Sequence, residues 1–254
     1  MSASKPRDWD AVTYDRVSTP QVQWALKVLD RLPLNGDETV LDAGCGSGRV
    51  TKVLEERLPR GKVIAVDASP SMVEKAREAL GPNAEVFVSD LVDLDLDQVV
   101  DAVFSNAVFH WIPDHDTLFK RLFEALKPGG QLVVQCGGAG NIERFHGVLF
   151  EVAKEEPFAQ YIGGWEGPWN FATPAETGAR LATAGFVEAQ CWLEDRPVEP
   201  DEPAEFMRTV CLGHHLDRLP EQLRPLLVER MMERVPKPVK LDYVRLNIDA
   251  WRPA

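Results

Sequence analysis

The run from Val40 to Val50, which reads VLDAGCGSGRV, holds residues whose types and spacing suit the binding of a cofactor. An apolar segment typical of a β-strand ends at Asp42, glycines follow at Gly44, Gly46 and Gly48, and a helical pattern comes next. Glycines lack a Cβ atom and let the backbone approach a ligand closely, and the start of a helix adds a partial positive charge. We therefore expect a nucleotide-like cofactor at this turn.

The spacing of the turn distinguishes between nucleotide cofactors. A dinucleotide fingerprint has its third glycine three positions after the second, where this chain has Arg49. A phosphate loop of the Walker type needs Lys and then Ser or Thr after its last glycine, and Gly48 is not followed by them. NAD, FAD and ATP are therefore disfavoured. Asp42, directly before the loop, suits a ligand that carries positive charge, and the ammonium group of S-adenosylmethionine is such a group.

Two more acids follow predicted strands. The apolar run from Lys62 ends at Asp67, and Ser69-Pro70 then starts a helix with Ser at the N-cap. An acid at the end of the second strand, about 20 residues past a glycine loop, is placed to accept both ribose hydroxyls. Asp90 follows the third predicted strand, residues 85–89. Each acid has a simpler interpretation as a solvated side chain at the start of a helix or in a loop.

The run VLDAGCGSGRV resembles motif I of the class I S-adenosylmethionine-dependent methyltransferases, and four later segments match in the family's order. The resemblance spans residues 36–136. It implies S-adenosyl-L-methionine as cofactor and S-adenosyl-L-homocysteine as its product. The cofactor-binding residues that it implies are Asp42, Gly44, Cys45, Gly46, Gly48, Asp67, Ala68, Met72, Asp90, Leu91, Asn106 and Ala107.

The segment SNAVFHWIPDH, residues 105–115, resembles the equivalent stretch of the trans-aconitate methyltransferases and of the biotin-pathway enzyme that methylates a carrier-bound malonyl group. Both make methyl esters. The resemblance implies that the Asn106-Ala107 backbone meets the cofactor and that Trp111 lines the active site. His110 stands where the family commonly has Gln. It is a candidate catalytic base, or else a structural hydrogen-bonding group beside Trp111.

Further candidate substrate residues lie outside these motifs. The N-terminal segment, about residues 9–32, resembles the family's lid helix, from which Tyr14 and Gln21 could face the site. An amphipathic helix that packs on the sheet explains the same pattern. Trp165 and Trp169 suit a hydrophobic acceptor or a small separate core, and Arg144 could clamp a substrate carboxylate or lie on the surface.

The alternation of strands and helices predicts an α/β fold with a doubly wound, mostly parallel sheet of seven strands. The last strand, Leu241 to Trp251, alternates apolar and polar residues as an antiparallel edge strand would. We interpret residues 1–254 as a single domain with a helical and aromatic cap inserted at about 137–172 and 201–236. The KPGG turn at residues 127–130 ends the helix before the fifth strand.

Composition limits the partners. The 254 residues are 44% hydrophobic, which is ample for a core, and the net charge of −12 disfavours nucleic acid as a substrate. The apolar runs are far shorter than the ~20 residues of a membrane span, and the N-terminus lacks the apolar core of a secretion signal. We expect a cytoplasmic protein that acts on a small molecule. The four cysteines have no metal-binding spacing, and the sequence leaves the oligomeric state open.

Methyl transfer from a sulfonium depends chiefly on alignment in a dry pocket, and a carboxylate is already ionised at neutral pH. The leading hypothesis is a methyltransferase that esterifies a small carboxylate. The alternatives are an O-, N- or C-methyltransferase of secondary metabolism, a methyltransferase acting on a carrier-bound acid, and a non-catalytic cofactor-binding module.

Overall fold

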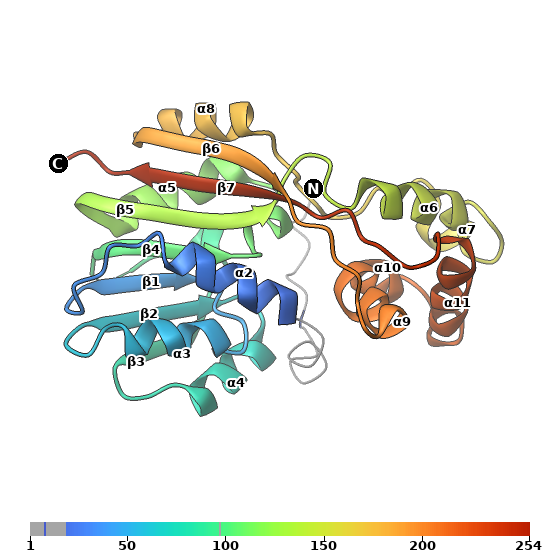
Figure 1. Ribbon diagram of the computed structural model, residues 1–254, viewed down its shortest axis with the longest axis horizontal. Helices are drawn as coiled ribbons and strands as arrows, with labels where there is room; N and C mark the ends of the chain where they lie inside the picture. Colours follow the sequence, from blue (N-terminus) through green and yellow to red (C-terminus); the bar gives the residue numbers. More distant parts are fainter. Residues whose placement is uncertain (1–7, 9–18, 97) are drawn as a thin grey trace.

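A computed structural model of the protein describes residue 8, residues 19–96 and residues 98–254 (Figure 1). These residues form one seven-stranded sheet with the order β3-β2-β1-β4-β5-β7-β6. The strands are β1 (Thr39–Ala43), β2 (Lys62–Asp67), β3 (Ala84–Val88), β4 (Val100–Asn106), β5 (Leu126–Gly137), β6 (Val187–Asp195) and β7 (Val244–Trp251). Strands β1 to β5 pair in parallel, and β7 is antiparallel to both of its neighbours. The predicted doubly wound, mostly parallel sheet is confirmed.

Helices cover both faces of the sheet (Figure 1). One face carries α2 (Thr19–Leu29), α3 (Arg49–Glu56) and α4 (Pro70–Ala79), and the other carries α5 (His115–Ala125) and α8 (Pro174–Ala184). The capping residues explain where two of them begin. Ser69 caps α4 by accepting the backbone N–H of Met72, and Thr173 and Glu176 form a capping box at α8.

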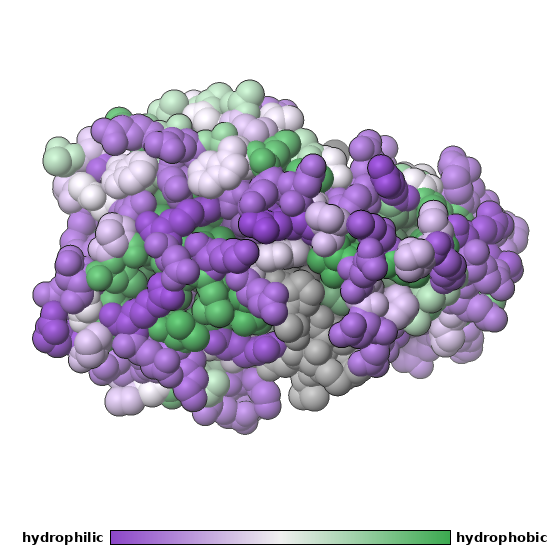
Figure 2. All heavy atoms as spheres, viewed as in Figure 1, coloured by the Kyte–Doolittle hydropathy of each residue, from purple (hydrophilic) through white to green (hydrophobic). Residues whose placement is uncertain are grey.

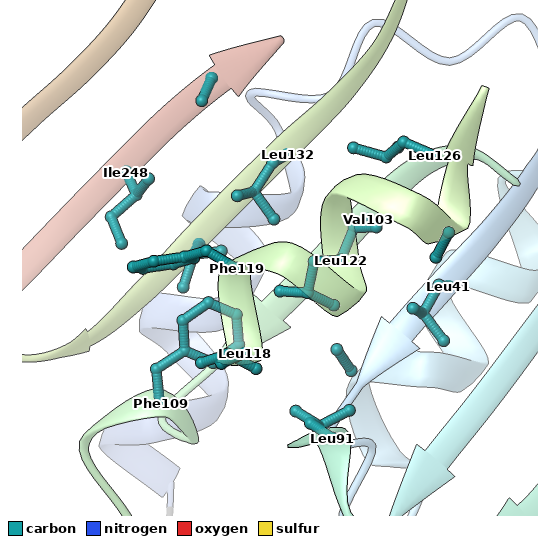
Figure 3. Packing of buried hydrophobic residues seen from close by; sticks show 14 of the residues in the cluster. Leu41, Leu91, Val103, Phe109, Leu118, Phe119, Leu122, Leu126, Leu132 and Ile248 are labelled. Carbon is teal, nitrogen blue, oxygen red and sulfur yellow. The ribbon is translucent and has the colours of Figure 1, made fainter. Parts of the chain in front are cut away.

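Alternate residues of the strands supply two separate cores. Leu41 of β1 and Ile64 of β2 face α5, whereas their neighbours Val40 and Val63 face α2, α3 and α4. On the α5 side, leucine and phenylalanine side chains of the helix pack against the strands (Figure 3). Since both faces are covered, the central residues of β1, β2 and β4 are buried and mostly apolar.

A third core lies beyond the end of the sheet, where short helices gather around buried apolar residues (Figure 1). We call this group the helical cap. It consists of α6 (Glu143–Ala153), α7 (Ala159–Ile162), α9 (Pro203–Phe206), the π-helix η3 (Met207–Cys211), α10 (Gly213–Asp217) and α11 (Arg224–Arg234). Both of the predicted cap segments contribute to it. Three 3₁₀ helices complete the described elements: η1 (Leu91–Asp93), η2 (Phe109–Trp111) and η4 (Glu221–Leu223).

The prediction that the last strand lies at the sheet edge is wrong, because β7 lies between β5 and β6 and the edge strand is β6. The polar residues of β7 suggested a face toward water, but Arg31 of the segment after α2 covers Asn247 and Asp249. Asn247 is buried, and its Oδ1 accepts hydrogen bonds from Arg31 Nη1 at 2.7 Å and Gln135 Nε2 at 2.9 Å. Arg31 also pairs with Asp249, Nε to Oδ1, at 3.2 Å. Buried hydrogen bonds therefore replace the solvent that the pattern indicated.

Two predicted boundaries also change. Helix α2 ends at Leu29 and not at Leu32, and the KPGG turn belongs to the first part of β5. There the N–H of Gly129 donates to the carbonyl of Arg252 at 3.0 Å. None of the described helices is long and apolar enough to cross a bilayer. On the face shown in Figure 2, hydrophilic residues predominate over the sheet part and over the helical cap.

Candidate functional site

A cavity of about 930 Å³ lies where the carboxyl ends of the parallel strands meet the helical cap. The segments that follow β1, β2, β3 and β4 contribute Gly44, Ala68, Ser89 and Ala107 to its lining. Other lining residues come from η2, from the segment before α8, and from η3, α10 and the start of β7. Ligands of open α/β sheets bind at this edge, so the cavity has the position that the fold predicts for a cofactor site.

The three glycines of the loop have different roles, although all have positive φ angles, at 91°, 55° and 85°. A Cβ added at Gly44 would lie 2.1 Å from Val108 Cγ2, and one at Gly48 would lie 3.1 Å from the Cα of Ala76. These two glycines allow close packing. A Cβ at Gly46 meets no atom within 4 Å, because this residue faces the cavity. Gly46 is therefore the position at which a missing side chain leaves room for a ligand.

Backbone N–H groups of the loop are used inside the protein, which corrects the expectation that they face a ligand. Gly44 and Cys45 both donate to the carbonyl of Val66, at 2.8 and 2.9 Å. The N–H of Gly46 donates to Oδ2 of Asp67 at 2.9 Å. A loop whose donors are occupied in this way has little to offer a phosphate. The loop exposes the Cα of Gly46 to the cavity, and this surface suits a cofactor whose nearest part carries no phosphate.

Asp67 closes the second strand at the floor of the cavity. Its two oxygens accept the N–H groups of Gly46 and Ser69, both at 2.9 Å, and a carboxylate offers about four acceptor sites in all. Burial raises the pKa of Asp67, and the nearby carboxylate of Asp8 acts in the same direction. Asp8 in turn accepts the hydroxyl of Ser69 at 2.5 Å. A hydroxyl donor from a ligand would supply the solvation that this buried carboxylate lacks.

The other predicted cofactor residues are brought together along the same edge. Ala68, Met72, Asp90, Leu91, Asn106 and Ala107 all line the cavity. Asp90 caps η1 by accepting the N–H of Val92 at 3.2 Å, and Ala107 has a φ of 63°, which is unusual without glycine. The buried hydroxyl of Ser105 donates to the carbonyl of Ala43 at 2.6 Å. This bond joins the end of β4 to the end of β1, directly before the glycine loop.

Three predicted cofactor residues do not line the cavity. Asp42 is buried beneath the loop, where its Oδ2 accepts the hydroxyl of Thr51 at 2.7 Å, and burial raises its pKa to about 7. Cys45 is buried in the core that faces α3, and Gly48 packs against α4. These residues support the loop from behind. The proposed contact of Asp42 with a ligand ammonium is therefore not direct.

His110 lines the cavity, and one nitrogen of its ring accepts a backbone hydrogen bond. The backbone N–H of Gly137 donates to His110 Nδ1 at 3.2 Å. Since a backbone N–H can only donate, Nδ1 keeps its lone pair and the proton of the neutral ring is on Nε2. Burial lowers the pKa of His110 well below its ordinary value, and the charge of Arg245 lowers it further. His110 is thus a neutral side chain with one N–H to offer.

Aromatic rings form the side of the cavity that belongs to η2 and the segment before α8. We call Trp111, Trp169 and Phe171 the aromatic wall. The Trp111 and Trp169 rings lie 6.2 Å apart, Trp169 and Phe171 lie 5.9 Å apart at 12°, and Phe171 stacks on His110 at 5.8 Å. Trp165 also lines the cavity, under the guanidinium of Arg218 at 4.3 Å. The predicted tryptophans therefore share one site.

The predicted carboxylate clamp, Arg144, does not reach this cavity. Its side chain is 90% exposed on the outer side of α6, where Nε lies 3.9 Å from Asp242 Oδ2. The prediction followed nearness to strand five in sequence, but the helix turns the side chain away. Tyr14 lies outside the described residues. Gln21 falls within α2, and its side chain is likewise outside them.

Sequence reasoning missed several lining residues of the cap side. Arg245, on β7, is 1% exposed and is paired in register with Gly137 of β5. Tyr243, His214 and Arg218 also line the cavity. These residues lie more than 100 positions after His110 and belong to no local motif. Only the pairing of β7 with β5 brings Arg245 beside His110.

Comparisons with known proteins agree with this geometry. The sequence pattern of a family described as a methyltransferase domain matches residues 40–130. The chain is 33% identical over 245 residues to a trans-aconitate 2-methyltransferase of Variovorax paradoxus, with 94% of each chain covered.

Two solved structures share the fold. The YcgJ protein from Bacillus subtilis has a TM-score of 0.65 at 16% identity, covering 91% of this chain and 99% of that one. Phosphoethanolamine N-methyltransferase 2 of Haemonchus contortus, in complex with S-adenosyl-L-methionine, has a TM-score of 0.64 at 19% identity, covering 96% of this chain and 57% of that one. The chain belongs to the S-adenosylmethionine-dependent methyltransferases, and within them to the relatives of trans-aconitate 2-methyltransferase.

Proposed function

We propose that this enzyme esterifies a small-molecule acid, transferring a methyl group from S-adenosylmethionine to a carboxylate oxygen. The cofactor supplies the methyl group: the new carbon–oxygen bond forms as the methyl–sulfur bond breaks, and the electron pair of that bond stays on sulfur. No proton has to leave an ionised carboxylate. The protein's contribution is to bind both molecules in line and to exclude water.

The cofactor half of the cavity suits these tasks. We assign the ribose hydroxyls to Asp67, whose carboxylate offers about four acceptor sites in all, and the adenine edge to Asp90 and the backbone of Leu91. Gly46 gives space for the methionine portion, and Asn106 and Ala107 face it from the end of β4. Since the N–H groups of Gly44 and Cys45 are already bonded to Val66, this loop matches a cofactor without phosphate.

The observation that carries the choice of acceptor is the hydrogen bond from Gly137 N–H to His110 Nδ1. A general base needs a free lone pair and a pKa near the working pH. The only lone pair of neutral His110 is engaged, and burial and Arg245 both oppose its protonation. His110 is therefore suited to donate through Nε2 to an anionic oxygen, and the charge of Arg245 favours the same kind of acceptor.

A hydroxyl or amine acceptor would require a base. Asp114 also lines the cavity, but both of its oxygens accept hydrogen bonds from Thr117, and its pKa is lowered by the Thr117 side chain and backbone. It is correspondingly weak as a base. The resemblance of the chain to trans-aconitate 2-methyltransferases supports a carboxylate acceptor too.

The test uses S-adenosylmethionine with a labelled methyl group and a panel of acids, each paired with its primary alcohol and its amine. Methyl esters release labelled methanol on mild alkaline treatment, whereas methyl ethers and methylamines do not. We expect base-labile label from acids only. Stable label from alcohols or amines would contradict the proposal. Stabilisation of the fold by S-adenosylhomocysteine is the control that the protein binds its cofactor.

A further inference from the structure

The cap side of the cavity carries a stacked pair of side chains, Arg218 and Trp165, whose role deepens the proposed function and rests on it. The guanidinium carbon of Arg218 lies 4.3 Å from the centre of the Trp165 ring, and both residues line the cavity. A guanidinium that is stacked on an aromatic face keeps its N–H groups at its edge, where they can form paired hydrogen bonds with a carboxylate. The stacked pair therefore has the shape of an anion-binding site.

The ring beneath Arg218 is held in place by the helical cap. The backbone N–H of Trp165 donates to the carbonyl of Ile162, at the end of α7, at 3.2 Å. The Trp165 ring also packs against the ring of His215, with the ring centres 4.6 Å apart. His215 is fully buried, and burial lowers its pKa to about 4. His215 is consequently neutral at neutral pH, and it fixes the Trp165 ring without adding a positive charge.

The guanidinium of Arg218 is not used to hold the protein together. In the described part of the chain, it lies over the Trp165 ring and forms no ion pair with an acid. Its N–H donors are therefore available to a ligand. Asp114 and Asp217 line the same cavity, so the surroundings do not attract anions in general. An anion is held here only through direct hydrogen bonds with Arg218.

Helix α10 separates Arg218 from the reacting end of the acceptor. His214 of α10 lies 4.9 Å from the ring of Trp111, which in turn lies 4.8 Å from the ring of His110. Arg218 follows His214 by four residues and keeps helical dihedral angles, φ −82° and ψ −14°. Residues at this spacing lie on one helix face with their Cβ atoms about 5–6 Å apart. Arg218 is thus about one helical turn beyond the rings next to His110, and an acceptor that reaches both must be extended.

We propose that Arg218, stacked on Trp165, determines specificity for an acceptor with two carboxylates at the ends of an extended chain. One carboxylate receives the methyl group beside His110, and the other accepts hydrogen bonds from Arg218. Methylation removes the charge of the first carboxylate. The monoester can then react again only with its uncharged ester group at Arg218. The enzyme therefore releases a monomethyl ester and methylates it a second time more slowly.

The first experiment compares straight-chain dicarboxylates, from succinate to suberate, with their monomethyl esters, which have the same chain and one charge fewer. We expect the ratio of kcat/KM for diacid to half ester to rise with chain length. It should reach about 20, of which about twofold reflects the two equivalent ends of a diacid and about tenfold the hydrogen bonds between its second carboxylate and the guanidinium. A ratio of about two or less at every length would overturn the inference and leave the methylation of carboxylates standing. Methylation of the matching diols and of neither form of the acid would instead overturn the proposed function.

A second experiment assigns this preference to Arg218. In Arg218→Leu, we expect the ratio of kcat/KM for diacid to half ester to fall to about two, because only the two equivalent ends of the diacid still favour it. Arg218→Lys keeps the charge but not the planar, stacked group, so it should retain only part of the preference. Arg144→Leu is the matched control, because it removes the same charge from a side chain that is 90% exposed and lies outside the cavity.

An unchanged ratio in Arg218→Leu, or an equal fall in Arg144→Leu, would contradict the assignment to Arg218. The ratio is measured within one variant, so a general loss of active protein cancels. Calorimetry with S-adenosylhomocysteine verifies that each variant is folded and binds its cofactor.

Discussion

Replacement of His110 by glutamine separates a hydrogen-bond donor from a catalytic base. Glutamine has an amide oxygen that can accept the Gly137 N–H, now bonded to Nδ1 at 3.2 Å, and an amide nitrogen that can donate as Nε2 does. Glutamine cannot take up a proton near neutral pH. The two possible roles of His110, hydrogen-bond donor and catalytic base, therefore predict different losses of kcat/KM in this variant.

For a donor, His110→Gln exchanges one neutral hydrogen bond for another of similar type, and such bonds contribute about 0.5–1.5 kcal/mol. We expect kcat/KM to fall by no more than about tenfold, since a factor of ten corresponds to about 1.4 kcal/mol. Loss of a general base costs roughly 10²–10⁴-fold. His110→Leu is the comparison variant. It removes the donor and leaves the buried N–H of Gly137 without its partner, so it should lose about 1–3 kcal/mol of stability as well as activity.

Single-turnover rates with saturating cofactor and a carboxylic acid acceptor give the chemical step, and calorimetry with S-adenosylhomocysteine gives cofactor affinity. The rate of the wild type should show no inflection near pH 6.5, because burial and Arg245 hold the pKa of His110 well below its ordinary value. A loss of 100-fold or more in the glutamine variant, with unchanged cofactor affinity, would refute the donor role and the carboxylate mechanism built on it.

Three further predictions concern the glycine loop and its acids. Gly46→Ala should weaken S-adenosylhomocysteine binding at least about tenfold in calorimetry at a stability cost of only about 1 kcal/mol, because its Cβ would enter the cavity. Gly44→Ala should instead lower the free energy of unfolding by at least about 2 kcal/mol, because its Cβ would clash with Val108. If urea titrations showed equal losses of stability for the two variants, the separate roles of Gly44 and Gly46 would be contradicted. Asp67→Ala should weaken cofactor binding by about 1.5–3 kcal/mol, and unchanged affinity in a folded variant would move the ribose elsewhere. The folded-state pKa of Asp42, about 7, lies above the unfolded value of 3.8, so the folded state holds the proton more tightly and stability should fall as pH rises from about 4 to about 7. In the Asp42→Asn variant, the free energy of unfolding should decline by up to about 4 kcal/mol less over this pH range than in the wild type. If the pH profile of unfolding were the same in both proteins, Asp42 would titrate normally.

The sequence by itself predicted the layered sheet and the cofactor edge, because both depend on local patterns. Ser69 caps α4 next to Pro70, as their types and order indicate. The apolar run that ends at Asp67 becomes a buried parallel strand, and the carboxyl ends of such strands meet at one edge whatever the rest of the chain does. The cofactor residues at that edge followed from their distance along the chain.

Local pattern was insufficient where a side chain has two possible surroundings. Asp42 and Asp67 both end strands, yet Asp42 points beneath the loop to Thr51 and only Asp67 lines the cavity. The alternation in β7 indicated a solvated face, whereas Asn247 is buried under Arg31 of the segment after α2. A sequence shows the polarity of a residue, but not whether water or another side chain satisfies it.

The acceptor side was decided by tertiary structure alone. Arg245 comes beside His110 because β7 pairs with Gly137 of β5, and long-range strand pairing leaves no trace in a local motif. The pairing of β4 with β5 brings the segment after β4 next to Gly137, whose N–H donates to His110 Nδ1 and so fixes the ring's proton on Nε2. Residue type made His110 a candidate for catalysis. The backbone donor that occupies its lone pair, and the buried cation next to it, determine which chemistry the ring can perform.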